Sequence, residues 1–216
     1  ENSLEPKPHN LTFEQAAAVP QACVLAYQGL KTTGQIQQGQ KVLINGAGGG
    51  VGTFAVQIAK RCGTEVTGVD YPHKLDVIKS LGADHVMDCS KEDFTQGGKQ
   101  FDLILDVFAH RSLLAYKRAL TPSGVYAMVG ATTLRIAQFL LLKPWTKLTG
   151  DSKQIRIVSE GPNKGLAEIT ELIESDQIAP VIDRTYPLRE VSDAMRYFTT
   201  GAHKGKIVIT MGNQSL

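Results

Sequence analysis

The residues that could do chemistry gather first in a glycine-rich stretch that follows a short apolar run. Val42 to Ile44 is apolar, as expected for a parallel strand covered on both faces. After the glycines, Val51, Phe54, Ala55 and Ile58 recur at the spacing of one helix face. Glycines between a strand and a helix let the backbone turn tightly and approach a pyrophosphate, whose charge the helix N-terminus favours. The stretch therefore predicts a dinucleotide-binding loop formed by Gly46, Ala47, Gly48, Gly49, Gly50, Val51 and Gly52.

The spacing of these glycines departs from the strict fingerprint G-x-G-x-x-G. Ala47 occupies the first glycine position, Gly49 and Gly52 occupy the other two, and Gly46 lies one residue before them. A flexible turn without a ligand is the alternative interpretation. The strand before the loop, the helix after it and an acid at the end of the next strand favour the dinucleotide.

That acid is Asp70, the last residue of the expected strand Glu65 to Asp70. A carboxylate at this place can accept hydrogen bonds from both ribose hydroxyls, which favours NAD, and it would repel the 2′-phosphate of NADP. Tyr71, His73 and Lys74 follow it and are further candidates for cofactor contact. For Lys74 the alternative is a solvated residue at the start of a helix.

Composition and charge exclude several classes of protein. The chain has 216 residues, 42% of them hydrophobic and 20% charged, which suits one globular domain or one domain with part of another. The net charge of +2, without a basic run, gives no indication of a nucleic-acid partner. Three scattered cysteines indicate reduced thiols, and no apolar run reaches the roughly 18 residues that a membrane span needs. We therefore expect a cytoplasmic protein with no membrane partner.

Strands and helices alternate along the chain, which predicts an α/β fold with a doubly wound parallel sheet (a Rossmann fold). A turn is expected at Pro122 to Gly124, and helices are expected from Gln21 to Thr32 and around Ile136 to Leu142. The expected strands are Val42 to Ile44, Glu65 to Asp70, His85 to Asp88, Phe101 to Asp106, Val125 to Val129 and Gln154 to Val158, with a last one at Lys206 to Thr210.

The ordered motifs resemble the medium-chain dehydrogenase/reductase superfamily, in its zinc-independent quinone oxidoreductase branch. The resemblance is carried by Leu11 to Pro20, Asn45 to Gly52, Leu81 to Val86 and His203 to Ile209. It implies a GroES-like substrate domain before the cofactor domain, and that domain is not in this chain. The implied division is lead-in helices over 1–34, a dinucleotide-binding Rossmann domain over 35–177, and a segment over 178–216 that returns to complete the substrate domain.

The resemblance also implies site residues and a cofactor. The path of the cofactor would be lined by Val107 and Phe108 after the fourth strand and by Val129 and Gly130 at the end of the fifth. Lys206 or a neighbour would lie near its phosphates or the domain cleft, and a charged turn without a ligand is the alternative interpretation. The branch commonly reads the phosphate of NADP with cations after the second strand, so His73 and Lys74 argue for NADP while Asp70 argues for NAD. We expect NADP or NAD, with a slight preference for NADP.

Zinc is not expected. Zinc-dependent relatives place a cysteine ligand where this chain has Gln21, and Cys23, two residues later, is better explained as a small buried residue. The resemblance implies NAD(P)H-dependent reduction of a quinone or of a carbon–carbon double bond beside a carbonyl, with a homodimer as a further expectation. The alternatives are an alcohol or aldehyde dehydrogenase, a non-catalytic nucleotide-binding module, and an enoyl reductase domain of a synthase. The catalytic residues are expected in the absent domain.

Overall fold

A six-stranded parallel sheet forms the centre of the molecule. The computed structural model describes residues 4–130, 152–158, 161 and 164–211. The sheet has the strand order β3-β2-β1-β4-β5-β6, and every neighbouring pair is parallel. Its strands are β1 Lys41–Asn45, β2 Glu65–Asp70, β3 His85–Asp88, β4 Phe101–Asp106, β5 Leu120–Met128 and β6 Gln154–Ile157. The order reverses between β1 and β4, so the predicted doubly wound sheet is confirmed.

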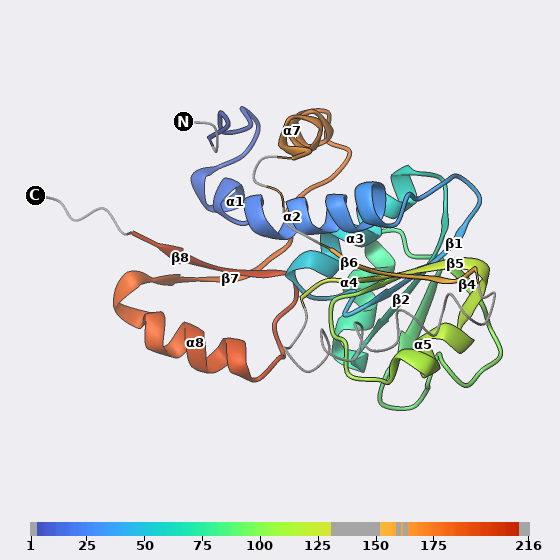
Figure 1. Cartoon of the computed structure of the whole chain (residues 1–216). Coiled ribbons are helices and arrows are strands. Elements are labelled where there is room, and N and C mark those ends of the chain that lie inside the picture. The colour runs from blue at the N-terminus through green and yellow to red at the C-terminus, as the bar shows by residue number, and fades with distance from the viewer. Residues whose placement is uncertain (1–3, 131–151, 159–160, 162–163, 212–216) are drawn as a thin grey trace, which may run out of the picture.

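Helices cover both faces of the sheet (Figure 1). One face carries α2 Pro20–Tyr27, α3 Gly50–Arg61, α4 Leu75–Ser80 and α7 Leu166–Glu174. The other face carries α5 Leu113–Arg118. Short elements complete this part of the chain: α1 Phe13–Ala17, the π-helical turn η1 Gln28–Thr33 and the 3₁₀ turn η2 Pro72–Lys74.

Alternation along each strand divides the apolar residues between two cores. Val42 and Ile44 of β1 pack with the α2 and α3 side, whereas Leu43 packs with Tyr116 and the α5 side. All three β1 residues are fully buried. A strand buried on both faces reads as a continuous apolar run, which is why the sequence located the central strands well.

A small second sheet extends from one side of the main body (Figure 1). It pairs β7 Ile182–Pro187 with β8 Lys206–Thr210 in parallel, and η3 Leu188–Glu190 and α8 Val191–Thr199 connect them. Val191, Met195 and Phe198 of α8 are 42%, 57% and 53% exposed. The side of α8 that these three apolar residues form is therefore largely uncovered in this chain.

Three expectations about local structure need comment. The expected turn at Pro122 to Gly124 is wrong, because these residues lie within β5, where the register against β4 shifts between Phe101 and Leu103. The expected helix from Gln21 to Thr32 is divided into α2 and the π-helical turn η1. The helix expected around Ile136 to Leu142 lies outside the described residues. Among the described helices, none is long and apolar enough to cross a membrane.

Candidate functional site

The glycine-rich loop lies across the carboxyl end of β2. The backbone N–H groups of Gly46 and Ala47 both donate to the carbonyl oxygen of Val69, at 2.9 and 3.1 Å. Gly46 has a φ of +83°, and a Cβ on it would lie 3.4 Å from Cβ of Val107 and 3.6 Å from Cβ of Phe108. The loop thus meets the ends of β2 and β4 at the point where the strand order reverses, which is where open α/β sheets bind ligands.

Gly52 fixes how closely helix α3 approaches this loop. A Cβ at this position would lie 2.1 Å from the carbonyl oxygen of Gly46 and 2.6 Å from two backbone atoms of Ala47. Backbone atoms cannot rotate away as a side chain can, so a residue with a Cβ does not fit here. Gly52 therefore serves the close helix–strand packing that the third position of a dinucleotide fingerprint requires.

The first turn of α3 provides donors for an anion. The helix begins after Gly49, whose position has no side-chain cap, and it runs for 12 residues. The early N–H groups of a helix lack intrahelical acceptors and carry the positive end of its dipole. Lys206 lies beside this turn, because a Cβ on Gly50 would be 2.6 Å from Cδ of Lys206. The arrangement fits a bound pyrophosphate.

Asp70 holds the loop from the end of β2. Its Oδ2 accepts the N–H of Gly48 at 2.8 Å, and its Oδ1 accepts the N–H of Tyr71 at 2.8 Å. Nζ of Lys74 lies 3.8 Å from Oδ1, and both side chains are only 7% exposed. The interpretation of Lys74 as a solvated residue is therefore wrong. Tyr71 and His73 are exposed and stack at 6.2 Å between ring centroids.

A buried polar network beneath the loop was not expected from the sequence. Asp106 is fully buried; its Oδ1 accepts from Nδ2 of Asn45 at 2.8 Å and its Oδ2 from the hydroxyl of Tyr126 at 2.7 Å. Burial and the nearby charge of Asp106 raise the pKa of Tyr126, so its hydroxyl stays a donor. Asn45 and Asp106 are register partners at the ends of adjacent strands. Each is a polar residue at the end of an apolar run, and this sequence signal could have predicted the pair.

This network positions the loop residues after β4 and β5. Nδ2 of Asn45 also donates to the carbonyl oxygen of Phe108 at 3.1 Å, and the N–H of Val129 donates to the carbonyl oxygen of Asp106 at 2.8 Å. The Phe108 side chain is 59% exposed. Gly130 is exposed with a φ of +72°. The predicted residues after these two strands thus lie at the same edge of the sheet as the glycine loop.

The C-terminal segment closes over the glycine loop. The N–H of Gly205 donates to the carbonyl oxygen of Gly48 at 2.8 Å, and Gly49 and Gly205 form a parallel bridge. His203 stacks on Phe198 at 4.9 Å. Its Nδ1 is buried and has no hydrogen-bond partner among the described residues. Burial and the charge of Lys74 lower the pKa of His203, so the ring is neutral at neutral pH.

Cys23, which lies two residues after the position of the zinc ligand in zinc-dependent relatives, is in the core. Cys23 is fully buried, and burial raises the pKa of its thiol. Within the described residues, no three His, Cys, Asp or Glu side chains gather closely enough to hold a metal ion. That the protein does not bind zinc stays a prediction from the sequence.

The strand order, the glycine loop and the helix that follows it define a Rossmann domain. The chain belongs to the medium-chain dehydrogenase/reductase superfamily, and residues 81–209 match the family model described as "Zinc-binding dehydrogenase".

Several known proteins are similar to this chain over nearly all of its length. The tomato (Solanum lycopersicum) 2-methylene-furan-3-one reductase is 32% identical and covers 94% of the chain, and the mouse (Mus musculus) mitochondrial NAD(P)H oxidoreductase RTN4IP1 is 30% identical and covers 97%. The spectinabilin polyketide synthase system protein NorB of Streptomyces orinoci is 33% identical over 96%. The structure of the quinone oxidoreductase from Coxiella burnetii superposes with a TM-score of 0.83, at 26% identity over 95% of this chain.

The matches also show how much of each relative this chain represents. It spans 48% of the tomato reductase, 59% of the mouse oxidoreductase and 10% of NorB, and 63% of the Coxiella chain.

Proposed function

We propose that this chain is the cofactor-binding part of an NAD(P)H-dependent oxidoreductase that reduces quinones or α,β-unsaturated carbonyl compounds. The observation that carries the proposal is the packing of Gly52 against the backbone of Gly46 and Ala47, which brings the uncapped start of α3 to the glycine loop. This backbone cradle suits a pyrophosphate and leaves no room for a side chain.

Each residue at the cradle has a role in the proposal. The first turn of α3 and Lys206 hold the pyrophosphate, while Phe108 and Gly130 lie along the path to the nicotinamide. The bound nicotinamide supplies the reducing equivalent as a hydride. The protein orients it and excludes water from the reacting carbon.

The preference between the two nicotinamide cofactors follows from Asp70 and Lys74. The Asp70 carboxylate is already bonded to the N–H of Gly48 and lies near the Lys74 ammonium. The Lys74 charge offsets the repulsion that Asp70 would exert on a 2′-phosphate. This pairing supports the slight preference for NADP(H) without removing the capacity of Asp70 to accept from a ribose.

The relatives support the substrate class. The tomato relative is named for the reduction of an enone, and the Coxiella structure is that of a quinone oxidoreductase. A quinone contains the same conjugated carbonyl group as an enone, so one site chemistry serves both. The match to NorB favours a second candidate, an enoyl reductase domain of a synthase. A cytoplasmic location and a homodimer remain part of the proposal.

Calorimetric titration of this chain with NADPH, NADH and ADP tests the cofactor site. We expect both nicotinamide cofactors to bind and NADPH to bind more tightly. No binding at millimolar cofactor would refute the proposal at its base.

Turnover of the full-length protein tests the substrate class. We expect NADPH oxidation with quinones and enones, none with alcohols as reductants, and no loss of rate on adding a chelator. Sensitivity to the chelator together with oxidation of alcohols would instead identify an alcohol dehydrogenase.

A further inference from the structure

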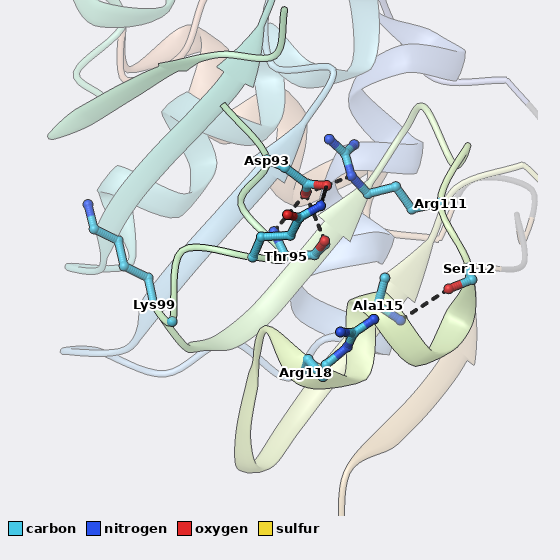
Figure 2. Close-up of a pocket in the computed structure, with 9 residues that line it drawn as sticks. Asp93, Thr95, Lys99, Arg111, Ser112, Ala115 and Arg118 are labelled. Atoms are coloured by element: carbon cyan, nitrogen blue, oxygen red, sulfur yellow. Dashed lines mark hydrogen bonds and ion pairs between the residues drawn. The ribbon is translucent and has the colours of Figure 1, made fainter. Parts of the chain in front are cut away.

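A second concave site lies apart from the glycine loop, between α5 and the segment that joins β3 to β4. Its volume is about 580 Å³, which is within the range of small-molecule sites. Figure 2 shows the side chains around it. It is lined by Asp93, Thr95, Gln96, Gly98, Lys99, Arg111, Ser112, Ala115 and Arg118. None of the residues assigned to the dinucleotide site is among them.

Asp93 is the only acid among the described residues of this lining, and it is already paired with Arg111. Oδ1 of Asp93 accepts from Nε of Arg111 at 2.8 Å and from the N–H and hydroxyl of Thr95 at 2.9 and 2.7 Å, and its Oδ2 accepts from Nε2 of Gln96 at 3.0 Å. Partial burial raises the pKa of Asp93, but the hydrogen bonds from Thr95 and the charge of Arg111 outweigh it and lower the pKa. Asp93 is therefore ionised at neutral pH, and its charge is balanced by Arg111.

The other two charged side chains of the pocket are cations, and neither is paired with another described residue. Lys99 and Arg118 are exposed, and within the described part of the chain neither has a hydrogen bond or ion pair. They come from different elements, the segment before β4 and the last turn of α5 (Figure 2). Two unpaired cations beside one hollow favour an anion over a neutral ligand.

The wall behind these cations is held in place. The Arg111 side chain is 15% exposed, and its guanidinium lies 5.1 Å from the centroid of the Phe94 ring. The hydroxyl of Ser112 accepts the N–H of Ala115 at 3.3 Å, which leaves its own proton available as a donor. The pocket therefore offers charged groups and neutral polar groups on a frame that needs little ordering.

We propose that this pocket binds a phosphorylated sugar. A phosphate monoester carries nearly two negative charges at neutral pH, which matches the two uncommitted cations, and the Arg118 guanidinium has the fork geometry that pairs with phosphate. Gln96 and Ser112 provide polar partners for sugar hydroxyls. None of the described residues in the lining is aromatic, so they offer no surface on which a nucleotide base could stack. A hollow rather than a flat surface also favours a small molecule over an acidic protein segment.

Titration of ¹⁵N-labelled protein with glucose 6-phosphate tests this site. NADPH is present at saturation in one series and absent in the other, so that phosphate binding at the glycine loop is recognised. We expect shifts of the Gly98 and Ala115 amide signals in both series, and no such shifts with glucose. Lys99→Gln and Arg118→Gln should each weaken binding about tenfold, because each removes one charge-assisted contact. Arg189→Gln, at an 80% exposed arginine in η3 of the connection between β7 and β8, is the matched control and should bind as the wild type does.

Three results would overturn the assignment. Shifts confined to Gly46–Gly52 that disappear with NADPH would place the phosphate at the dinucleotide site. Equal affinity of the Lys99→Gln and Arg118→Gln variants and of the wild type would show that the pocket cations do not bind it. Displacement of glucose 6-phosphate by a polyglutamate peptide at lower concentration would identify a protein segment as the occupant.

Discussion

The strongest test of the dinucleotide site is the replacement of Gly52 by alanine. The new Cβ would lie 2.1 Å from the carbonyl oxygen of Gly46 and 2.6 Å from backbone atoms of Ala47. Overpacking of this kind costs about 1–3 kcal/mol, and because the contacted atoms are backbone the upper end applies. Alanine is favoured over glycine in a helix by about 1 kcal/mol. We therefore expect Gly52→Ala to reduce the free energy of unfolding by about 2 kcal/mol.

Cofactor affinity should change with stability, because the methyl group separates α3 from the loop that it has to meet. We expect the Kd for NADPH to rise at least about tenfold, which corresponds to about 1.4 kcal/mol. Urea unfolding followed by circular dichroism gives the first quantity and calorimetry gives the second. Gly97→Ala is the matched control, since a Cβ at Gly97 would meet nothing within 4 Å. If Gly52→Ala binds and unfolds as Gly97→Ala does, the close-packing argument fails.

Three further outcomes are expected. Tyr126→Phe leaves Oδ2 of Asp106 without its donor and should lower the unfolding free energy in urea by about 1–3 kcal/mol; an unchanged urea midpoint contradicts the network. Asp70→Ser removes the ribose acceptor and should raise the Kd for NADH about tenfold relative to that for NADPH; a constant ratio in calorimetry argues against that role. Burial and Lys74 depress the pKa of His203 below 6.5, so the unfolded state binds more protons as the pH falls below 6.5, and stability should decline there. His203→Phe keeps a ring beside Phe198 and should flatten that decline in urea midpoints measured across pH; an equally steep decline would show that His203 is not its source.

The parts of the fold that were predictable are those encoded by neighbouring residues. Leu43 and Ile44 belong to an apolar run that is buried on both faces of the sheet, so strand β1 could be predicted from local hydrophobicity alone. The glycine loop could also be predicted, because the strand, the turn and the helix that form it are consecutive in the sequence. Pro122 shows the limit of local reasoning: a turn was expected from Pro122 to Gly124, but these residues lie within the span of β5.

The parts that could not be predicted depend on contacts between distant residues. Asp70 is only four residues from Lys74, but the burial of Lys74 also depends on the distant glycine loop at Gly48, which packs against it. Asp106 has partners on β1 and β5 whose register the sequence does not state. The hydrogen bond between Gly205 and Gly48 joins two distant segments, and no local sequence pattern predicts it. Side-chain periodicity places a residue on a face, but it does not identify which distant segment covers that face.

The contact between Gly205 and Gly48 affects the order in which parts of the cofactor site form during synthesis. The two residues are far apart in the sequence, so the loop cannot be closed on this side until synthesis has passed Gly205. During synthesis the sheet can form first and leave the loop open on that side. Cofactor captured afterwards would hold the last strand in place, so ligand binding and the docking of β8 would reinforce one another. Gly205 thus completes a site whose glycine loop is formed by residues much earlier in the sequence.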